Sequence, residues 1–123
     1  MPKDKAGKLV AGKLSPQRAV PNSIQRPEYV GKPSPAPHVG GDKYDLDTIA
    51  RIRKASKVAA QALDLVLASA KPGMTTDDLD RIGHEFLLDH DAYPSALLYR
   101  GFPKSICTSV NEVICHGIPD DTV

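Results

Sequence analysis

The chain has 123 residues, of which 41% are hydrophobic and 25% are charged, and its formal net charge at pH 7 is +1. Two cysteines are too few for a disulfide-stapled secreted scaffold, and the sequence shows neither a signal-peptide pattern nor an apolar run long enough to span a bilayer. We therefore expect a cytoplasmic protein with free thiols and one modest folded domain.

Residues 1–44 differ in composition from the rest of the chain. They hold seven of the eleven prolines and carry eight Lys/Arg against three Asp/Glu, a net charge of +5, whereas residues 45–123 carry eight against twelve, a net charge of −4. Frequent prolines favour an extended, polyproline-like backbone without a packed core. The sequence therefore predicts an extended, basic, Pro-rich N-terminal arm over residues 1–44 and an acidic folded part over residues 45–123.

Two interpretations of the arm are open. It is either a solvated segment or strap laid over the folded part, or a docking arm for a partner that is anionic or has an aromatic groove, with ribosomal RNA as the anionic candidate. Only Tyr29 and Tyr44 interleave the basic residues, which is too few aromatic rings for a nucleic-acid stacking platform. No specific DNA binding is therefore expected.

A first helix is predicted from apolar residues that recur at steps of three and four between Ile49 and Ala70. Asp47 is expected to cap its N-terminus, and Pro72-Gly73 ends the periodic run. The many alanines of this helix predict close packing against another element.

A second helix is predicted to start at Thr75 or Thr76, where a cap hydroxyl is followed by first-turn carboxylates. His84 falls off the apolar stripe of this helix and is expected to be solvated. His90 is expected in the last turn, where an imidazole interacts favourably with the helix dipole. The apolar stripe consists of Leu79, Ile82, Gly83, Phe86 and Leu87.

Three short strands are predicted to follow the helices. Pro94 opens an extended segment, of which residues 96–99 form the first strand. Residues 106–110 and 113–117 are predicted to pair as a hairpin across the turn Asn111-Glu112. The order of elements, two helices and then antiparallel strands after an extended arm, is that of an α+β fold.

The predicted hairpin places Cys107 opposite His116 on one face of the sheet and Cys115 on the other face. A Cys–His nucleophile fits this geometry but lacks an orienting Asp or Asn. A metal site that adds Cys115 lacks C-x-x-C or H-x-x-x-H spacing. The third candidate is an apolar substrate pocket. Its lining would be Tyr99, Phe102 and Cys107, with His116 at the rim.

Several motifs are long and dense enough to compare with a known family. They are Lys71-Pro72-Gly73-Met74-Thr75-Thr76, Tyr99-Arg100-Gly101-Phe102-Pro103-Lys104-Ser105, Cys107, Ser109, Asn111-Glu112, Cys115-His116-Gly117-Ile118-Pro119 and, in the arm, Arg26-Pro27-Glu28-Tyr29-Val30-Gly31-Lys32-Pro33. The motifs of the folded part resemble type I methionine aminopeptidases. The arm motif is similar to the N-terminal extension of one bacterial subgroup. The chain therefore resembles the N-terminal part of such an enzyme.

The resemblance implies the pita-bread (creatinase/aminopeptidase) fold and removal of the initiator methionine from nascent proteins by a two-metal hydrolase. By position, His116 resembles the catalytic and substrate-binding histidine that hydrogen-bonds the scissile peptide and steadies the tetrahedral intermediate. Tyr99, Phe102 and Cys107 match the pocket for the methionine side chain, where a polarisable thioether suits aromatic and thiol walls. Ala96 stands where some members have a cysteine.

The resemblance also implies two divalent metal ions (Co, Mn, Fe or Zn). The family holds them with two Asp, one His and two Glu, and all five lie downstream of the matched segment. No metal ligand is therefore expected in this chain, and we expect the chain alone not to hydrolyse peptides. Asp120 and Asp121 are expected to be turn residues.

These observations favour the N-terminal part of a methionine aminopeptidase, present as a fragment or a truncated gene product. The alternative is a non-catalytic peptide- or ribosome-binding module derived from the same fold. A cysteine hydrolase is the third hypothesis, which requires a reactive thiolate at Cys107.

Overall fold

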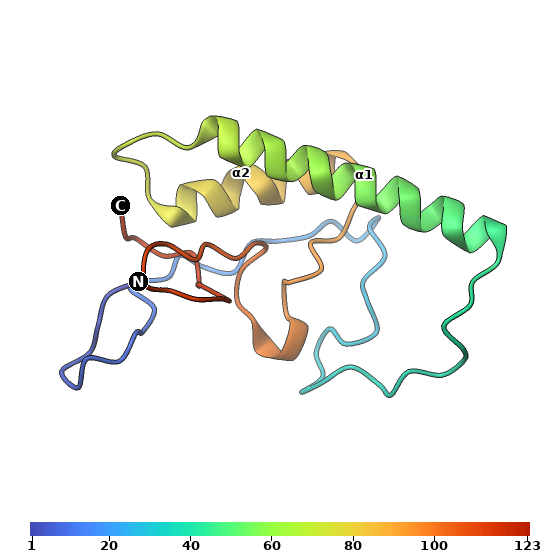
Figure 1. Cartoon of the computed structure of the whole chain (residues 1–123), viewed down its shortest axis with the longest axis horizontal. Helices are drawn as coiled ribbons and strands as arrows, with labels where there is room; N and C mark the ends of the chain where they lie inside the picture. Colours follow the sequence, from blue (N-terminus) through green and yellow to red (C-terminus); the bar gives the residue numbers. More distant parts are fainter.

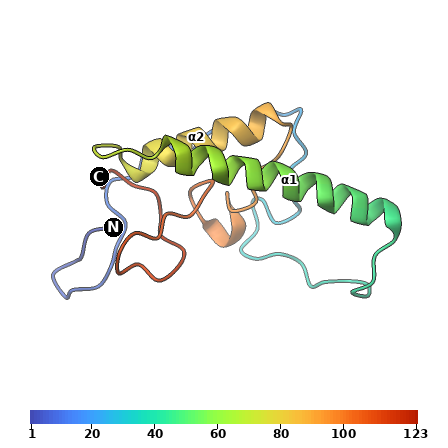
Figure 2. The ribbon, with the colours of Figure 1, turned by 45° about the horizontal axis from the view of Figure 1, so that its top comes forward.

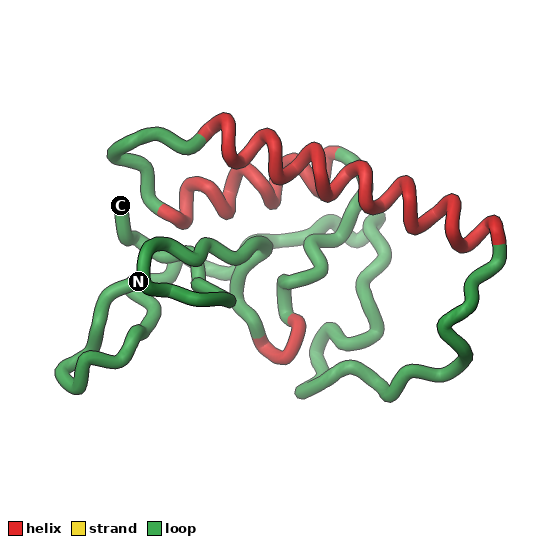
Figure 3. Tube along the Cα trace, in the orientation of Figure 1, coloured by secondary structure: helices red, strands yellow, loops and turns green.

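Two helices carry the fold, and the rest of the chain is irregular. The computed structural model describes residues 1–123, in which α1 (Leu46–Ser69) is followed by α2 (Thr76–Asp89) and by a short 3-10 helix, η1 (Tyr99–Gly101). The two helices lie side by side, with the irregular segments gathered below them in the view of Figure 1. No strand is assigned, as Figure 3 shows. The two predicted helices are confirmed and the predicted strands are not.

Helix α1 begins where the Asp45 carboxylate accepts a hydrogen bond from the Thr48 backbone N–H (2.7 Å) and so caps the helix. The predicted cap, Asp47, lies instead in the first turn and forms an exposed ion pair with Arg51 (2.9 Å). The cap prediction was wrong because both aspartates precede the same apolar repeat, and only the backbone geometry chooses between them. The helix ends before the Pro-Gly turn, as predicted.

Helix α2 begins in a capping box at the predicted position. Thr75 Oγ1 accepts a hydrogen bond from the Asp78 N–H (3.1 Å), and the Asp78 carboxylate accepts one from the Thr75 N–H (2.9 Å). Two further N–H groups of the first turn, which have no partner inside a helix, donate to the carbonyls of Asp120 and Thr122. The first turn of α2 therefore holds the C-terminal segment of the chain.

Gly83 lets α1 and α2 approach closely, as the rotated view of Figure 2 shows for the two helices. A Cβ atom at this position would lie 3.1 Å from Ile106 Cγ2 and 3.3 Å from Val66 Cγ2, so a larger residue would force these elements apart. The apolar core around this contact is small, and neither helix combines the length and the apolar character needed to cross a bilayer. The buried apolar residues are Ile24, Ala62, Val66, Leu97 and Val113.

Asp80 joins three parts of the chain. Its carboxylate is fully buried; Oδ1 accepts hydrogen bonds from the N–H groups of Ser105 (2.7 Å) and Ile106 (3.0 Å), and Oδ2 accepts one from Arg18 Nε (3.0 Å). A buried carboxylate is tolerated only when its charge and its lone pairs are matched in this way. Helix α2, the arm and the segment after η1 therefore share one anchor.

Lys104 extends this anchor. Its side chain is only 1% exposed, which is unusual for lysine, and Nζ donates to Asp77 Oδ1 (2.5 Å) and to Ser15 Oγ (2.6 Å). Arg18 Nη2 donates to the other oxygen of Asp77 (3.0 Å). Two cations and two carboxylates thus neutralise one another in a polar cluster that consists of Arg18, Asp77, Asp80 and Lys104.

His84 lies against this polar cluster, and the prediction that it is solvated was wrong. The residue is 4% exposed; Nε2–H donates to the Ala19 carbonyl (2.9 Å), and Nδ1 is bonded to Ser105 Oγ (2.7 Å). The ring falls off the apolar stripe because it faces the arm, not because it faces water. His90, which was predicted in the last turn of α2, is the residue that directly follows the helix, and it donates through Nδ1–H to the Phe86 carbonyl (2.8 Å).

Residues 1–44 contain no helix; their hydrogen bonds to the folded part lie between Gly12 and Tyr29, and the teal segment that leads into α1 loops away from the other segments (Figure 1). The Gly12 N–H donates to the buried carboxylate of Asp120 (2.7 Å), and the Lys13 N–H donates to Asp121 Oδ1 (2.9 Å). These contacts bring the two chain termini to the same side of the molecule (Figure 1). Both aspartates therefore bind the arm, and the division of the chain into an arm and a domain stays a prediction.

The strand predicted over residues 96–99 is replaced by turns. Leu98 and Arg100 have φ values of 64° and 49°, which lie in the left-handed region. Residues with this geometry cannot continue an extended strand, so the chain coils and Tyr99 begins η1.

The predicted hairpin of residues 106–110 and 113–117 is also absent as a regular ladder. The chain does turn back on itself, but the Thr108 N–H donates to the Gly117 carbonyl (2.9 Å), two residues beyond the predicted partner. A two-stranded hairpin is marginal in water unless further strands or a helix cover it. No third strand lies beside this segment, which explains why the pairing stays irregular.

Asp80→Ala is expected to lower the free energy of unfolding by about 3–5 kcal/mol, because it leaves Arg18 and two backbone N–H groups without their acceptor. Asp80→Asn keeps one amide oxygen as an acceptor and should cost less. Urea unfolding followed by circular dichroism measures both. Asp89→Ala, an exposed aspartate in the same helix, is the matched control and should change the free energy by less than about 0.5 kcal/mol. Equal losses for the two alanine variants would contradict the anchoring role.

The polar cluster is expected to weaken in acid. Burial acts to raise the pKa of the Asp77 carboxyl, but the hydrogen bonds from Lys104 and Ser15 and the charges of Arg18 and Lys104 hold the pKa below its ordinary value. A depressed pKa contributes stability that is present above the unfolded-state pKa of about 4 and is lost as the pH falls through the folded-state pKa. The free energy of unfolding should therefore fall progressively below about pH 4.

Urea unfolding at a series of pH values measures this acid slope. Asp77→Asn removes the titrating group and should flatten the slope, whereas Asp64→Asn, an exposed aspartate on α1, should leave it unchanged. An identical slope for both variants and the unmodified chain would mean that the cluster does not set the acid stability.

Candidate functional site

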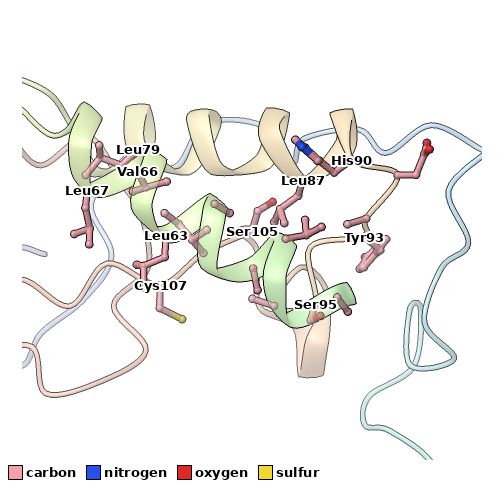
Figure 4. Close-up of a pocket in the computed structure, with 18 of the residues that line it drawn as sticks. Leu63, Val66, Leu67, Leu79, Leu87, His90, Tyr93, Ser95, Ser105 and Cys107 are labelled. Atoms are coloured by element: carbon pink, nitrogen blue, oxygen red, sulfur yellow. The ribbon is translucent and has the colours of Figure 1, made fainter. Parts of the chain in front are cut away.

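An open apolar groove lies between α1, α2 and residues 105–110. Its volume is about 870 Å³. Figure 4 shows leucine and valine side chains of both helices gathered around it, with Tyr93 and Ser95 at one end. Leu63 and Leu67 of α1 line this groove and are exposed. An uncovered apolar surface of this kind marks an interaction or binding site.

Cys107 lies on the groove, and its sulfur points away from the helices in Figure 4. The thiol is free and the residue is exposed. Partial burial raises the pKa of Cys107, and the neighbouring Cys115 and Asp80 raise it further. The thiol is therefore protonated at neutral pH, which disfavours a nucleophile and suits an apolar wall.

Tyr99 and Phe102 lie on the turn around η1, outside the groove lining. Tyr99 is 43% exposed, and its ring contacts that of Tyr29 in an edge-to-face arrangement with centroids 5.3 Å apart. The guanidinium carbon of Arg100 lies 5.9 Å from the Tyr99 ring centroid. The Phe102 N–H donates to the Tyr99 carbonyl (2.9 Å), so one turn holds both aromatic residues.

His116 is exposed on a turn, with a backbone φ of 54°, and its ring makes no hydrogen bond within the chain. The following residue, Gly117, passes so close to the Thr108 carbonyl that a Cβ atom would overlap it. This close approach fixes the backbone beside the histidine. The imidazole is therefore displayed from an anchored turn and is available to an external group.

The structure brings these four predicted site residues together only in part. One turn joins the two aromatic residues, and Cys107 lies separately on the groove, whose lining includes neither His116 nor the aromatic pair. The predicted pairing of Cys107 with His116 is replaced by the bond between Thr108 and Gly117. The roles assigned to the four residues stay a prediction.

The chain contains no group of three or more His, Cys, Asp or Glu side chains that could hold a metal ion. Its buried carboxylates are already bonded to donors, as Asp120 is to the N–H groups of Gly12 (2.7 Å) and Thr122 (2.9 Å). The residues present therefore do not fit a metal centre. They supply an apolar groove, an aromatic turn and an exposed imidazole.

The contact between Tyr29 and Ser95 was not predicted from the sequence. The Tyr29 hydroxyl donates to the Ser95 carbonyl (2.5 Å) across 66 positions of sequence. No spacing or periodicity connects the two residues, and the only available signal is that Tyr29 is one of two tyrosines in the arm.

Comparison with known proteins defines the class of protein to which this helix pair and its following turns belong. The model of metallopeptidase family M24 matches residues 50–123, which include most of α1, all of α2 and the four predicted site residues. The chain belongs to metallopeptidase family M24.

The particular relatives are methionine aminopeptidases. Methionine aminopeptidase 2 of Mycobacterium tuberculosis is 56% identical over 117 residues, which cover 94% of this chain and 40% of the relative. Methionine aminopeptidase 1 of Saccharomyces cerevisiae is 45% identical over 125 residues, which cover 96% of this chain and 32% of the relative. The crystal structure of methionine aminopeptidase from Rickettsia prowazekii superposes with a TM-score of 0.62 and 46% identity, over 64% of this chain and 32% of that chain. The chain thus spans two fifths or less of the length of these relatives.

Gly117→Ala is expected to lower the free energy of unfolding by about 1–3 kcal/mol, because its methyl group would overlap the Thr108 carbonyl and push the two segments apart. Urea unfolding measures the loss, and faster hydrogen exchange of the Thr108 amide locates it. Gly41→Ala is the control, since a Cβ atom there meets no close neighbour. An unchanged Thr108 amide in Gly117→Ala would show that the close approach does not hold this turn.

Proposed function

We propose that this chain supplies part of a methionine aminopeptidase, the metalloexopeptidase that removes the N-terminal initiator methionine from nascent proteins. The observation that carries this proposal is the 56% identity to the Mycobacterium tuberculosis relative over 94% of the chain. The family match over residues 50–123 supports it, because that range includes the imidazole and pocket residues on which the activity would depend.

In this function His116 contacts the scissile peptide and steadies the oxyanion of the tetrahedral intermediate through a hydrogen bond. Its exposed ring, without a partner in the chain, supports this role. Tyr99, Phe102 and Cys107 receive the methionine side chain, for which aromatic rings and a neutral thiol form a polarisable wall.

We propose that the metal centre of the enzyme is built from residues outside this chain. Two divalent ions (Co, Mn, Fe or Zn) are proposed for the complete enzyme, with ligands outside residues 1–123, because no three His, Cys, Asp or Glu side chains inside this range are grouped closely enough to hold an ion. The chain alone is therefore proposed to be inactive.

The antiparallel strands of the pita-bread fold are part of the same proposal. Residues 106–110 and 113–117 would pair regularly once further strands of the fold lie beside them. The exposed apolar groove and the 96% exposed side chain of Ile114 support this, since both are surfaces that a covering sheet would bury.

The positive charge of the arm supports the proposal that the enzyme acts close to the ribosome. Residues 1–44 carry a net charge of +5, and Lys5 and Lys8 are exposed near the N-terminus. A basic segment is attracted to the phosphates of ribosomal RNA, beside which nascent chains emerge in the cytoplasm. We therefore include ribosome contact and a cytoplasmic location in the proposal.

A chimaera tests the function. In the Mycobacterium tuberculosis relative, the matched segment is replaced by this chain, so that the relative supplies whatever the chain lacks. The chimaera is expected to bind divalent metal and to release methionine from Met-Ala-Ser, and the 123-residue chain alone to do neither. Amino-acid analysis and metal analysis measure the two properties. If the chain alone bound stoichiometric metal and released methionine, the proposal that the metal ligands lie outside it would be overturned. A folded, metal-loaded chimaera without turnover would overturn the proposed function.

His116→Ala in the chimaera should lower kcat by about 10²–10³-fold, the usual effect of removing one oxyanion donor. His38→Ala, an exposed histidine of the arm, is the matched control and should leave kcat unchanged. If His116→Ala kept the full rate, the histidine would have no role in the reaction, and the family assignment would still hold.

A further inference from the structure

Tyr29 links the arm to the turn that carries Tyr99. Its hydroxyl donates to the Ser95 carbonyl (2.5 Å), at the start of that turn. Its ring lies edge-on to the Tyr99 ring, with centroids 5.3 Å apart and an interplanar angle of 84°, which is a favourable aromatic arrangement. One side chain of the arm thus holds the turn at two points.

Tyr29 is itself firmly placed. Its carbonyl accepts a hydrogen bond from the Lys32 N–H (3.0 Å), within a local turn. Beside it, the Glu28 carboxylate accepts hydrogen bonds from the Ala36 N–H (2.8 Å) and from Lys32 Nζ (3.2 Å), which ties the arm to itself. Partial burial raises the pKa of the Tyr29 hydroxyl, so it remains a donor to the turn at neutral pH.

Tyr99 depends on outside support. It lies between Leu98 and Arg100, which both have positive φ, and it belongs to no strand or long helix that would fix its side chain. Its hydroxyl makes no hydrogen bond in the chain. Its ring packs against that of Tyr29 and lies beneath the exposed guanidinium of Arg100. Of these two neighbours, Tyr29 is the one that hydrogen bonds hold in place.

We propose that Tyr29 is a positioning residue for Tyr99, so that the arm sets the orientation of an aromatic wall of the methionine pocket. This inference rests on the proposed function, in which Tyr99 receives the methionine side chain. A wall that is already oriented costs less to order when substrate binds. Because Tyr99 holds the side chain and not the reacting peptide, its misplacement weakens substrate and transition state about equally and raises KM more than it lowers kcat.

The first experiment uses the 123-residue chain with isotope-labelled tyrosine. In the NMR spectrum of the unmodified chain, nuclear Overhauser effects between the rings of Tyr29 and Tyr99 are expected. Tyr29→Ala should shift the Tyr99 ring signals and broaden or average them. Tyr44→Ala, which removes the other tyrosine of the arm, should leave them in place. Tyr99 signals that do not respond to Tyr29→Ala would overturn the proposal.

The second experiment uses the chimaera described above and Met-Ala-Ser. Tyr29→Ala should raise KM by about 2- to 10-fold with kcat within about 2-fold, as expected for losing one aromatic pair. Tyr29→Phe keeps the ring and should restore most of the affinity. Tyr44→Ala should leave both constants unchanged. Circular dichroism of each variant confirms that the helices are retained.

The outcomes separate this inference from the proposed function. An active chimaera in which Tyr29→Ala leaves KM unchanged overturns the positioning role and leaves the function standing. A loss of kcat alone, or a Tyr29→Phe variant as weak as Tyr29→Ala, also overturns it, because ring packing would then not be the cause. An inactive, metal-loaded chimaera with unmodified Tyr29 overturns the proposed function, and with it the inference.

Discussion

A carboxylate that is buried away from water must accept hydrogen bonds from protein groups, and the structure depends on how Asp80 meets this requirement. The only groups that reach it are Arg18 of the arm and the backbone N–H groups of Ser105 and Ile106. Satisfying one charge therefore draws the arm and the segment after η1 onto the same face of α2. Because the apolar core is small, this polar cluster carries much of the tertiary organisation that burial provides in a larger domain.

The arm is consequently a structural part of the molecule. Its first half binds the C-terminal segment through Gly12 and Asp120, its middle enters the polar cluster, and Tyr29 reaches the turn of Tyr99. Each of these contacts joins residues that are far apart in sequence. The C-terminal segment, the polar cluster and the turn of Tyr99 are thus held by polar and aromatic contacts in a chain whose strands are not formed.

The molecule also leaves a large apolar surface uncovered. Residues of α1 such as Leu63 and Leu67 line the groove from one side, and no sheet lies against them. The chain spans two fifths or less of the length of the relatives that it matches. In the proposed function, this chain would recognise the substrate and residues outside it would activate water.

The sequence by itself determined the features that depend on neighbours a few positions apart: both helices, the Thr75 capping box, the Pro-Gly turn and the motifs that identify metallopeptidase family M24. Tertiary structure alone decided the burial of His84, the donors around Asp80 and the contact of Tyr29 with Tyr99. It also decided against the predicted strands. The physical reason is the same in each case: helix and cap energies arise within one turn of chain, whereas strand pairing and the burial of charge depend on which distant groups arrive as partners.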